Sequence, residues 1–197
     1  MIEPSPETTP YPEDRAAAAP PGASVAEILD RLCATVPDYP KPGIIFKDLT
    51  PAFADPQGLR AIVDAIVAPF IGQFDLVAGI EARGFLLAAA AAYATGTGVL
   101  TVRKAGKLPR ETFLEEYALE YGTAALEVHT TDIAPGARVL VLDDVLATGG
   151  TVGAAVRLVG RCGGDVVGVG VVLELDGLGG REALAGHRVH SLQRLGD

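Results

Sequence analysis

Residues 139–151 constrain the fold of this chain more than any other stretch. Four consecutive apolar residues at 139–142 are typical of a strand that is buried on both faces. Asp143 and Asp144 follow, then a glycine-rich turn, and then an apolar-periodic segment over 152–161 that predicts a helix. Strands buried on both faces belong to parallel sheets with helices on each side, so this stretch indicates an α/β fold.

The turn after the two acids has the residues of an anion-binding loop. Gly149 and Gly150 lack side chains, so backbone N–H groups can approach a phosphate closely, and Thr148 and Thr151 add hydroxyl donors. The helix that follows presents unpaired N–H groups at its start. The adjacent carboxylates would repel a phosphate, so they indicate a ligand with a second part that carries hydroxyls or a metal. A sugar phosphate meets both requirements; the alternative is a strand end whose acids only cap the backbone.

Composition and absent motifs exclude several classes of protein. The 197 residues carry a formal net charge of −9, whereas nucleic-acid binding through phosphates requires a basic face. The motifs G-x-x-x-x-G-K-S/T and G-x-G-x-x-G after a strand do not occur, which counts against P-loop hydrolases and dinucleotide-binding folds.

Location is also predicted from composition. We find no signal-peptide pattern, and the apolar segment 85–94 is shorter than the roughly 20 residues that span a bilayer. Cys33 and Cys162 have no metal-ligand spacing and are expected to be reduced thiols. We therefore expect a cytoplasmic protein that binds neither nucleic acid nor membrane.

Two further strands are predicted to end in charged residues. Residues 75–80 form an apolar strand that ends in Glu81, Ala82 and Arg83, and the strand that begins at Gly98 is followed by a cluster of cations. The carboxyl ends of parallel strands meet at one edge of a sheet, so these groups are expected beside the anion-binding loop. An internal Glu81–Arg83 salt bridge and a solvated basic face are the alternatives.

Two connections are expected to be irregular. After a helix with a capping box at Ser24 and Glu27, which runs to about residue 33 or 35, prolines at 37–42 predict irregular chain as far as Gly43. The apolar residues 44–46, in a loop or a short extended piece, then either plug the edge of the core or form a slot for a flat ring. Residues 110–121 are polar and aromatic, and such a long connection between strands suggests a lid.

The residues Asp143 to Thr151 resemble the phosphoribosyl-pyrophosphate (PRPP) motif of the type I phosphoribosyltransferases, and most closely that of the adenine-specific members. The resemblance covers about residues 24–184, through four motifs in the expected order. It implies a mainly parallel central sheet flanked by helices, with a small N-terminal hood at about residues 36–50. Residues 24–197 would be a single domain, preceded by a loosely packed or disordered tail at 1–23.

The resemblance also implies roles for particular residues. It implies a cis peptide bond between Glu81 and Ala82, and it places a lysine, Lys47, where family members often have arginine. Glu120 would contact the purine and Tyr121 would close over the reaction centre. The implied contacts are, for the ribose, Asp143 and Asp144; for the 5′-phosphate, Ala147, Thr148, Gly149, Gly150 and Thr151; for pyrophosphate, Glu81, Ala82, Arg83, Arg103, Lys104 and Lys107; and for adenine, Ile45, Phe46 and Lys47.

The reaction implied is that of adenine with PRPP, which gives AMP and pyrophosphate. Mg²⁺ would be held mainly by the substrate, with no direct protein ligand, and the basic residues would act in part across a homodimer. Transfer to another purine, such as xanthine, hypoxanthine or guanine, is the alternative within the family. A non-catalytic regulator that senses PRPP is the alternative outside enzymes.

Overall fold

The computed structural model describes residues 22–39, 41–42, 45–118 and 122–196. The helices are α1 (Val25–Leu32), α2 (Thr50–Ala54), α3 (Pro56–Val67), the 3₁₀ turn η2 (Ala68–Phe70), α4 (Arg83–Thr95), α5 (Gly150–Arg161) and α6 (Gly180–Ala183). The strands are β1 (Ala34–Pro37), β2 (Ile45–Asp48), β3 (Leu76–Ile80), β4 (Gly98–Lys104), β5 (Thr112–Ala118), β6 (Thr123–His129), β7 (Arg138–Leu146), β8 (Asp165–Leu175) and β9 (Val189–Leu195).

A seven-stranded sheet forms the centre of the molecule, with the order β5-β6-β4-β3-β7-β8-β9. The neighbours from β4 to β9 are parallel, whereas β6 is antiparallel to both β4 and β5. The carboxyl ends of β3, β4 and β7 therefore meet at one edge. The mainly parallel sheet flanked by helices is confirmed.

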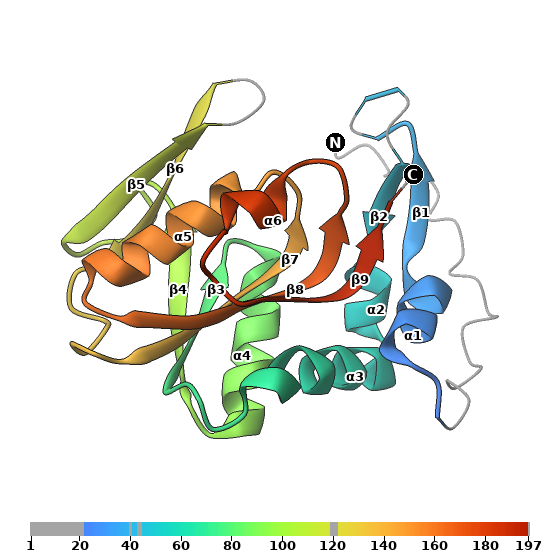
Figure 1. Ribbon diagram of the computed structural model, residues 1–197, viewed down its shortest axis with the longest axis horizontal. Helices are drawn as coiled ribbons and strands as arrows, with labels where there is room; N and C mark the ends of the chain where they lie inside the picture. Colours follow the sequence, from blue (N-terminus) through green and yellow to red (C-terminus); the bar gives the residue numbers. More distant parts are fainter. Residues whose placement is uncertain (1–21, 40, 43–44, 119–121, 197) are drawn as a thin grey trace, which may run out of the picture.

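Helices cover both faces of this sheet (Figure 1). Along β7, Leu140 and Leu142 pack into the core formed with α1 to α4, and Val139 and Val141 pack into the core formed with α5. All four side chains are fully buried, as expected for a central strand whose residues alternate between two covered faces. Among the described residues, no helix is long and apolar enough to span a membrane.

Two of the helix starts follow directly from local sequence. Ser24 and Glu27 form the predicted capping box, in which the Ser24 N–H donates to Glu27 Oε2 at 2.7 Å and the Glu27 N–H to Ser24 Oγ at 3.3 Å. Asp55 caps α3 by accepting from the backbone N–H groups of Gln57 and Gly58. These caps fix the helices that build one side of the sheet.

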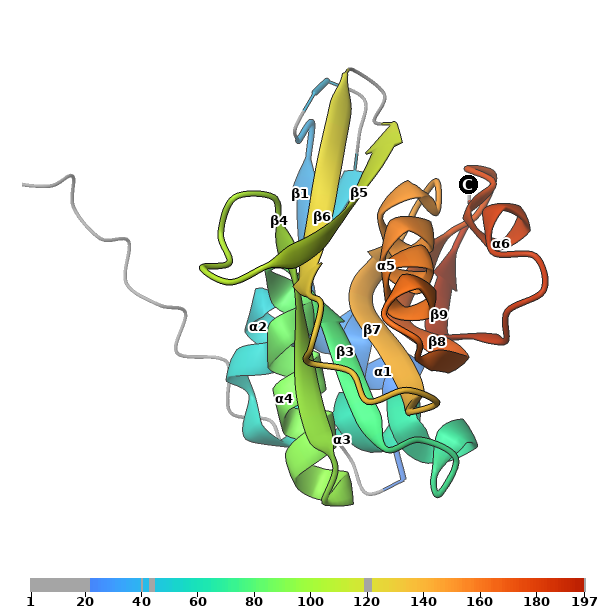
Figure 2. The same cartoon turned by 90° about the vertical axis from the view of Figure 1, so that its left-hand side faces the viewer.

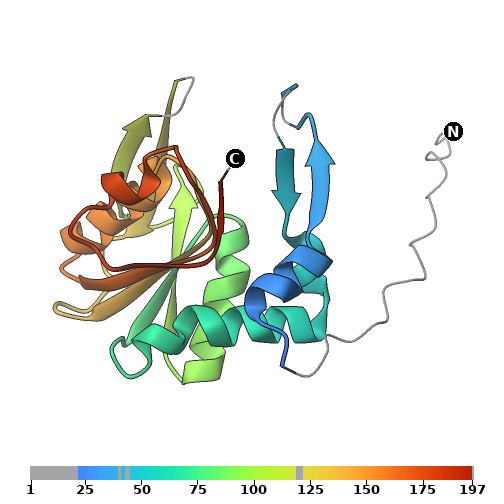
Figure 3. The ribbon, with the colours of Figure 1, turned by 45° about the vertical axis from the view of Figure 1, so that its right-hand side comes forward.

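The N-terminal segment contains a strand, β1, that was not predicted from the sequence, whereas β2 agrees with the short extended piece expected at residues 44–46. The first helix ends at Leu32, and β1 then pairs antiparallel with β2, with Val36 opposite Phe46. Pro37 is compatible with β1 because it lies at the end of a strand in a two-stranded sheet, where a missing N–H donor is tolerated. The β1–β2 hairpin stands beside α1, apart from the main sheet (Figure 3).

The expected irregular connection at 110–121 is also wrong over much of its length. Residues Thr112–Ala118 are strand β5, which pairs with β6 along its whole length, and the two strands form a ribbon that projects from the body of the molecule (Figure 2). The side chains alternate: Phe113, Glu115 and Tyr117 are less exposed than Leu114 and Glu116. Arg161 of α5 lies over the Phe113 ring at 5.1 Å, so one face of the ribbon packs on a helix.

Candidate active site

The two aspartates lie inside strand β7 rather than after it. Pairing of β7 with β3 ends at Leu142, but pairing with the longer β8 continues through Asp143 to Leu146. The predicted strand 139–142 was therefore too short, because a partner distant in sequence extends it. As a result, the pairing of β7 with β8 holds Asp143 and Asp144 on one side. On the other side, they lie beyond the last residue of β7 that pairs with β3.

This acidic pair is buried. Asp143 is 8% exposed and Asp144 is 7% exposed, and the Asp144 N–H donates to Asp143 Oδ1 at 2.9 Å. Burial raises the pKa of the Asp143 carboxyl well above its ordinary value, and the charge of Asp144 raises it further. Two adjacent carboxyl groups removed from water are unfavourable for folding unless something opposes their charge.

Arg83 at the start of α4 opposes that charge. Its Nε atom lies 2.5 Å from Asp144 Oδ2, which is buried and accepts no aligned hydrogen bond from the described residues. The contact is thus an ion pair rather than an aligned hydrogen bond. The guanidinium carbon of Arg83 also lies 5.7 Å from the centroid of the Phe46 ring, so the hairpin meets the same site.

The loop before Arg83 is tied to the end of β4. The Glu81–Ala82 peptide bond is cis, as expected from the resemblance. The Glu81 carboxylate accepts from the Lys104 backbone N–H at 2.9 Å and from Arg103 Nε at 3.3 Å. The Lys104 N–H and then Arg103 hold the pKa of Glu81 below its ordinary value, so this carboxylate is charged and joins two of the predicted segments.

A single cleft is lined by eight of the predicted residues, together with Tyr117 and Val145. It has a volume of about 580 Å³. Its lining contains members of the acidic pair, the loop at 81–83, the end of β4 and the anion-binding loop: Glu81, Ala82, Arg83, Lys104, Tyr117, Asp143, Asp144, Val145, Ala147 and Thr151. Tyr117 and Val145 were not selected from the sequence, and only the alternation in β5 signalled that Tyr117 faces inward.

The anion-binding loop encloses a smaller hollow of about 80 Å³, lined by Asp143 and residues 145–152. Gly149 has a positive φ of 82°, a conformation that favours glycine, and α5 begins at the next residue. Gly150 lies against the ribbon, because a Cβ there would be 3.2 Å from the Ala118 carbonyl oxygen. The loop, its backbone N–H groups and the helix start thus have the arrangement of an anion cradle.

Other predicted residues lie outside the cleft lining in this chain. Arg103 is half-buried and Lys107 is exposed; the Lys107 N–H donates to Glu127 Oε1 at 2.6 Å. In the hairpin, Ile45 is 68% exposed, and Lys47 Nζ donates to Thr35 Oγ1 at 2.8 Å. Glu120 and Tyr121 lie outside the described residues.

The chain is similar to known proteins over most of its length. Residues 55–189 match the model of the phosphoribosyl transferase domain family. Adenine phosphoribosyltransferase of Arthrobacter sp. (strain FB24) is 72% identical over 171 residues, which cover 87% of this chain and 92% of the relative.

Solved structures agree with the sequence relatives. The adenine phosphoribosyltransferase of Rhodothermus marinus superimposes with a TM-score of 0.81 at 48% identity, covering 87% of this chain and 98% of that one. The Saccharomyces cerevisiae enzyme, solved with an imino-altritol bisphosphate and adenine, gives 0.81 at 36% identity, covering 86% and 98%. This chain belongs to the phosphoribosyltransferase family and, within it, to the adenine phosphoribosyltransferases.

Proposed function

We propose that this protein transfers the 5-phosphoribosyl group of PRPP to adenine and releases pyrophosphate, which yields AMP for purine salvage. The single observation that carries the proposal is the cleft in which an anion cradle, a buried acid pair and Arg83 beside the Phe46 ring come together. The cradle matches the phosphate of a sugar phosphate, the acid pair matches its ribose hydroxyls, Arg83 matches a pyrophosphate at the other end of the sugar, and the Phe46 ring matches a flat base.

The anion cradle holds the 5′-phosphate in this proposal. Ala147, Thr148, Gly149, Gly150 and Thr151 supply backbone N–H groups and hydroxyls, and the start of α5 adds its positive dipole end. Asp143 and Asp144, adjoining this loop on β7, accept from the ribose hydroxyls. Fixing both ends of the sugar places its C1 atom against the purine nitrogen and reduces the entropy lost in the reaction.

The leaving group is stabilised at the edge formed by β3 and β4. As the C1–O bond breaks, its electron pair stays with pyrophosphate, and the purine nitrogen then donates a pair to C1. Arg83 and Lys104 line the cleft at this point, with the loop at Glu81 and Ala82. Positive charges and backbone N–H groups there oppose the negative charge that develops on pyrophosphate, while the two aspartates favour the cationic sugar.

The hairpin, with Glu120 and Tyr121, completes the base site in this proposal. Phe46 stacks on adenine, and the main chain at Ile45 and Lys47 contacts its polar edge. Glu120 hydrogen-bonds the purine or accepts the proton that it loses, and Tyr121 covers the reaction centre. The ribbon and the hairpin project from the same side of the molecule, which supports a cover that excludes water from activated ribose (Figure 1).

Mg²⁺ fits this site as an ion held mainly by the substrate. Mg²⁺ is commonly held by one or two carboxylates with phosphates and water, and Asp143 and Asp144, which line the cleft, would support the ion through the ribose hydroxyls that they hold. When bound, the ion neutralises pyrophosphate charge.

We further propose a cytoplasmic homodimer, in which residues 24–197 act as one domain. Cys33 and Cys162 are free thiols, which fits a reducing compartment. Leu86 and Tyr93, two turns apart on α4, are 55% and 93% exposed, and neighbouring Val99 on β4 is 49% exposed. We call these three residues the α4 face. Arg103 lies on the same side of β4 as Val99, which supports a role for Arg103 and Lys107 at the partner's pyrophosphate.

A purine panel with PRPP and Mg²⁺ tests the function. Adenine should be consumed with a higher kcat/KM than hypoxanthine, guanine or xanthine, with AMP and pyrophosphate formed in equal amounts. Preference for another purine would overturn the base assignment. Binding of PRPP without turnover of any base would favour a PRPP-sensing regulator. The Asp143→Asn, Asp144→Asn double variant should remain folded and lose most activity, because both ribose contacts lose their charge.

A further inference from the structure

The outer wall of the anion cradle is a short helix from a different part of the chain. A Cβ at Gly180 of α6 would lie 2.2 Å from the Ala147 carbonyl oxygen, and a Cβ at Gly149 would lie 2.8 Å from both Ala183 Cβ and the Gly180 carbonyl oxygen. The two backbones are therefore in direct contact, with glycine on each side. Any movement of α6 changes the space available to the cradle.

The local backbone gives α6 little rigidity of its own. The helix has four residues, and its start at Gly179 has no side-chain cap. Gly177 and Gly179, which precede it, both have positive φ angles, and glycines lose the most conformational freedom when they are ordered. Side-chain contacts must therefore contribute to the position of α6, together with the buried Leu184 that follows it.

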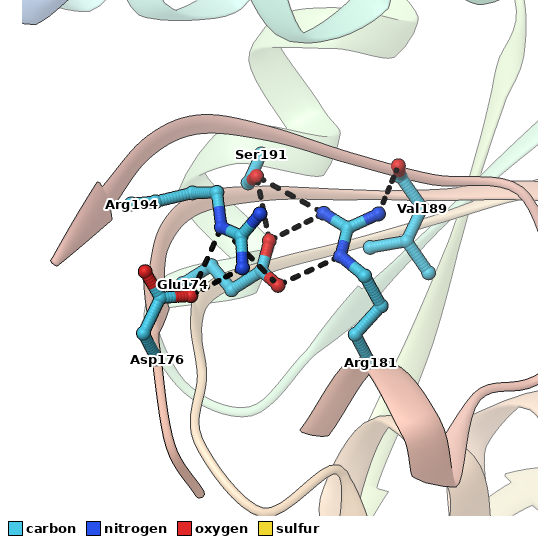
Figure 4. A network of polar contacts seen from close by, with 6 residues as sticks. All are labelled: Glu174, Asp176, Arg181, Val189, Ser191 and Arg194. Carbon is cyan, nitrogen blue, oxygen red and sulfur yellow. Dashed lines mark hydrogen bonds and ion pairs between the residues drawn. The ribbon is translucent and has the colours of Figure 1, made fainter. Parts of the chain in front are cut away.

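Arg181 provides such a contact through Glu174, near the end of β8. Arg181 Nε donates to Glu174 Oε1 at 2.8 Å and Nη2 donates to Oε2, so the pair is bidentate (Figure 4). The Glu174 side chain is only 4% exposed. Its opposite strand neighbour on β7 is Leu146, the residue directly before the anion cradle.

Strand β9 completes the network around this pair. Ser191 Oγ donates to Glu174 Oε2 at 2.7 Å, and Arg181 Nη1 donates to the Val189 carbonyl at 3.2 Å. Arg194 lies 3.8 Å from Glu174 Oε1 and donates to Asp176 at 2.9 Å (Figure 4). The buried carboxylate thus fixes α6 to two strands of the main sheet.

We propose that Glu174 and Arg181 are positioning residues that hold α6 against the cradle and so preserve its affinity for the 5′-phosphate. The proposal rests on the assignment of residues 147–151 to that phosphate. Backbone donors bind an anion best when they are fixed before it arrives, so a loosened wall weakens phosphate binding in particular. The base and ribose sites lie on other elements and keep their contacts.

AMP and adenosine test this, because they differ only by the 5′-phosphate. Dissociation constants of both are measured by calorimetry for the wild-type protein and for Glu174→Gln, which keeps the shape but removes the charge. We expect the AMP-over-adenosine preference to fall about tenfold, which is about 1.4 kcal/mol, with adenosine affinity changed less than about twofold. A reduced folded fraction lowers both affinities equally and cancels in the ratio.

Two further variants make the result specific. Arg181→Lys keeps the charge but cannot form the bidentate contact, so it should also lower the preference for AMP over adenosine. This variant serves as the test if the Glu174→Gln protein does not fold. Asp75→Asn is the control, because it breaks a bidentate pair with Arg138 at the amino-terminal end of β3 and β7. It should leave the preference unchanged.

The outcomes separate this inference from the proposed function. A wild-type protein that binds AMP no better than adenosine would overturn the phosphate assignment and, with it, this proposal. If the wild-type protein prefers AMP and this preference persists in Glu174→Gln and Arg181→Lys, the positioning role alone is overturned. The positioning role is also overturned if Asp75→Asn loses the preference for AMP to the same extent. In steady state, the supporting result is a raised KM for PRPP with little change in KM for adenine.

Discussion

At the scale of one residue, the burial of Asp143 links protonation of its carboxyl to the stability of the fold. Burial, and then the charge of Asp144, raise the pKa of its carboxyl well above the ordinary value of 3.8. The folded protein therefore binds a proton more tightly than the unfolded chain does. The free energy of unfolding consequently falls as pH rises from the unfolded-state pKa through the raised pKa of the folded state.

We expect Asp143→Asn to raise the free energy of unfolding at neutral pH by about 1 kcal/mol or more, because it removes a buried charge without a full partner. The asparagine Oδ1 can still accept from the Asp144 N–H. The gain should be smallest near about pH 4 and should grow toward neutral pH. Urea unfolding over this range checks it. A gain independent of pH would contradict the electrostatic cause, and activity of the same protein should fall.

At the scale of elements, the packing of α4 on β3 sets the position of Arg83. A Cβ at Gly79 of β3 would lie 2.5 Å from the Gly84 carbonyl oxygen and 2.7 Å from Ala88 Cβ. The helix can approach the strand this closely only because residue 79 has no side chain. Arg83 is the first residue of α4, so the height of the helix above the sheet determines where its guanidinium lies.

Gly79→Ala should therefore destabilise the protein by about 1–3 kcal/mol, the usual range for an overpacked core, and should also reduce kcat/KM. Gly160→Ala on α5 is the matched control, because a Cβ there meets nothing within 4 Å. Alanine in a helix should stabilise it by about 0.5–1 kcal/mol. Thermal unfolding and activity of the two variants check the pair; an unaffected Gly79→Ala protein would show that α4 shifts freely.

Local patterns predicted some elements, and the missed ones depend on distant partners. The capping box at Ser24 and the helix start at Asp55 are contained in a few residues, so they could be predicted. Strand β5 became regular only by pairing with β6 and packing on α5, although its alternation was present in the sequence. Likewise, the acids at 143–144 lie within β7 because β8 extends alongside them.

The candidate site follows the same division. Motifs placed Arg83, Lys104 and the anion-binding loop at one edge, because parallel strands bring their ends together. The sequence contained no comparable signal for Glu174 and Arg181, because their proposed role depends on the close approach of α6 to the cradle. That approach is a property of the assembled fold.

At the scale of the whole molecule, we expect the α4 face to be buried in a homodimer. Tyr93→Asp places a charge at its most exposed residue, so it should shift the protein to the monomer in light scattering. Activity should fall about tenfold or more if the partner's basic residues complete the site. Ile71→Asp, at a residue 57% exposed outside this face, should remain dimeric. An active monomeric Tyr93→Asp protein would exclude a shared site.

If pyrophosphate binds Arg83 as proposed, the ion pair of Arg83 with Asp144 makes ligand entry an exchange of anions. A pyrophosphate that takes Arg83 displaces a resident carboxylate, so the affinity measured is the difference between two ion pairs. Dissolved salt weakens both, so binding should depend less steeply on ionic strength than the cations around the cleft suggest. The displaced carboxylate then becomes available to a ribose hydroxyl, which links capture of one end of the donor molecule to capture of its middle.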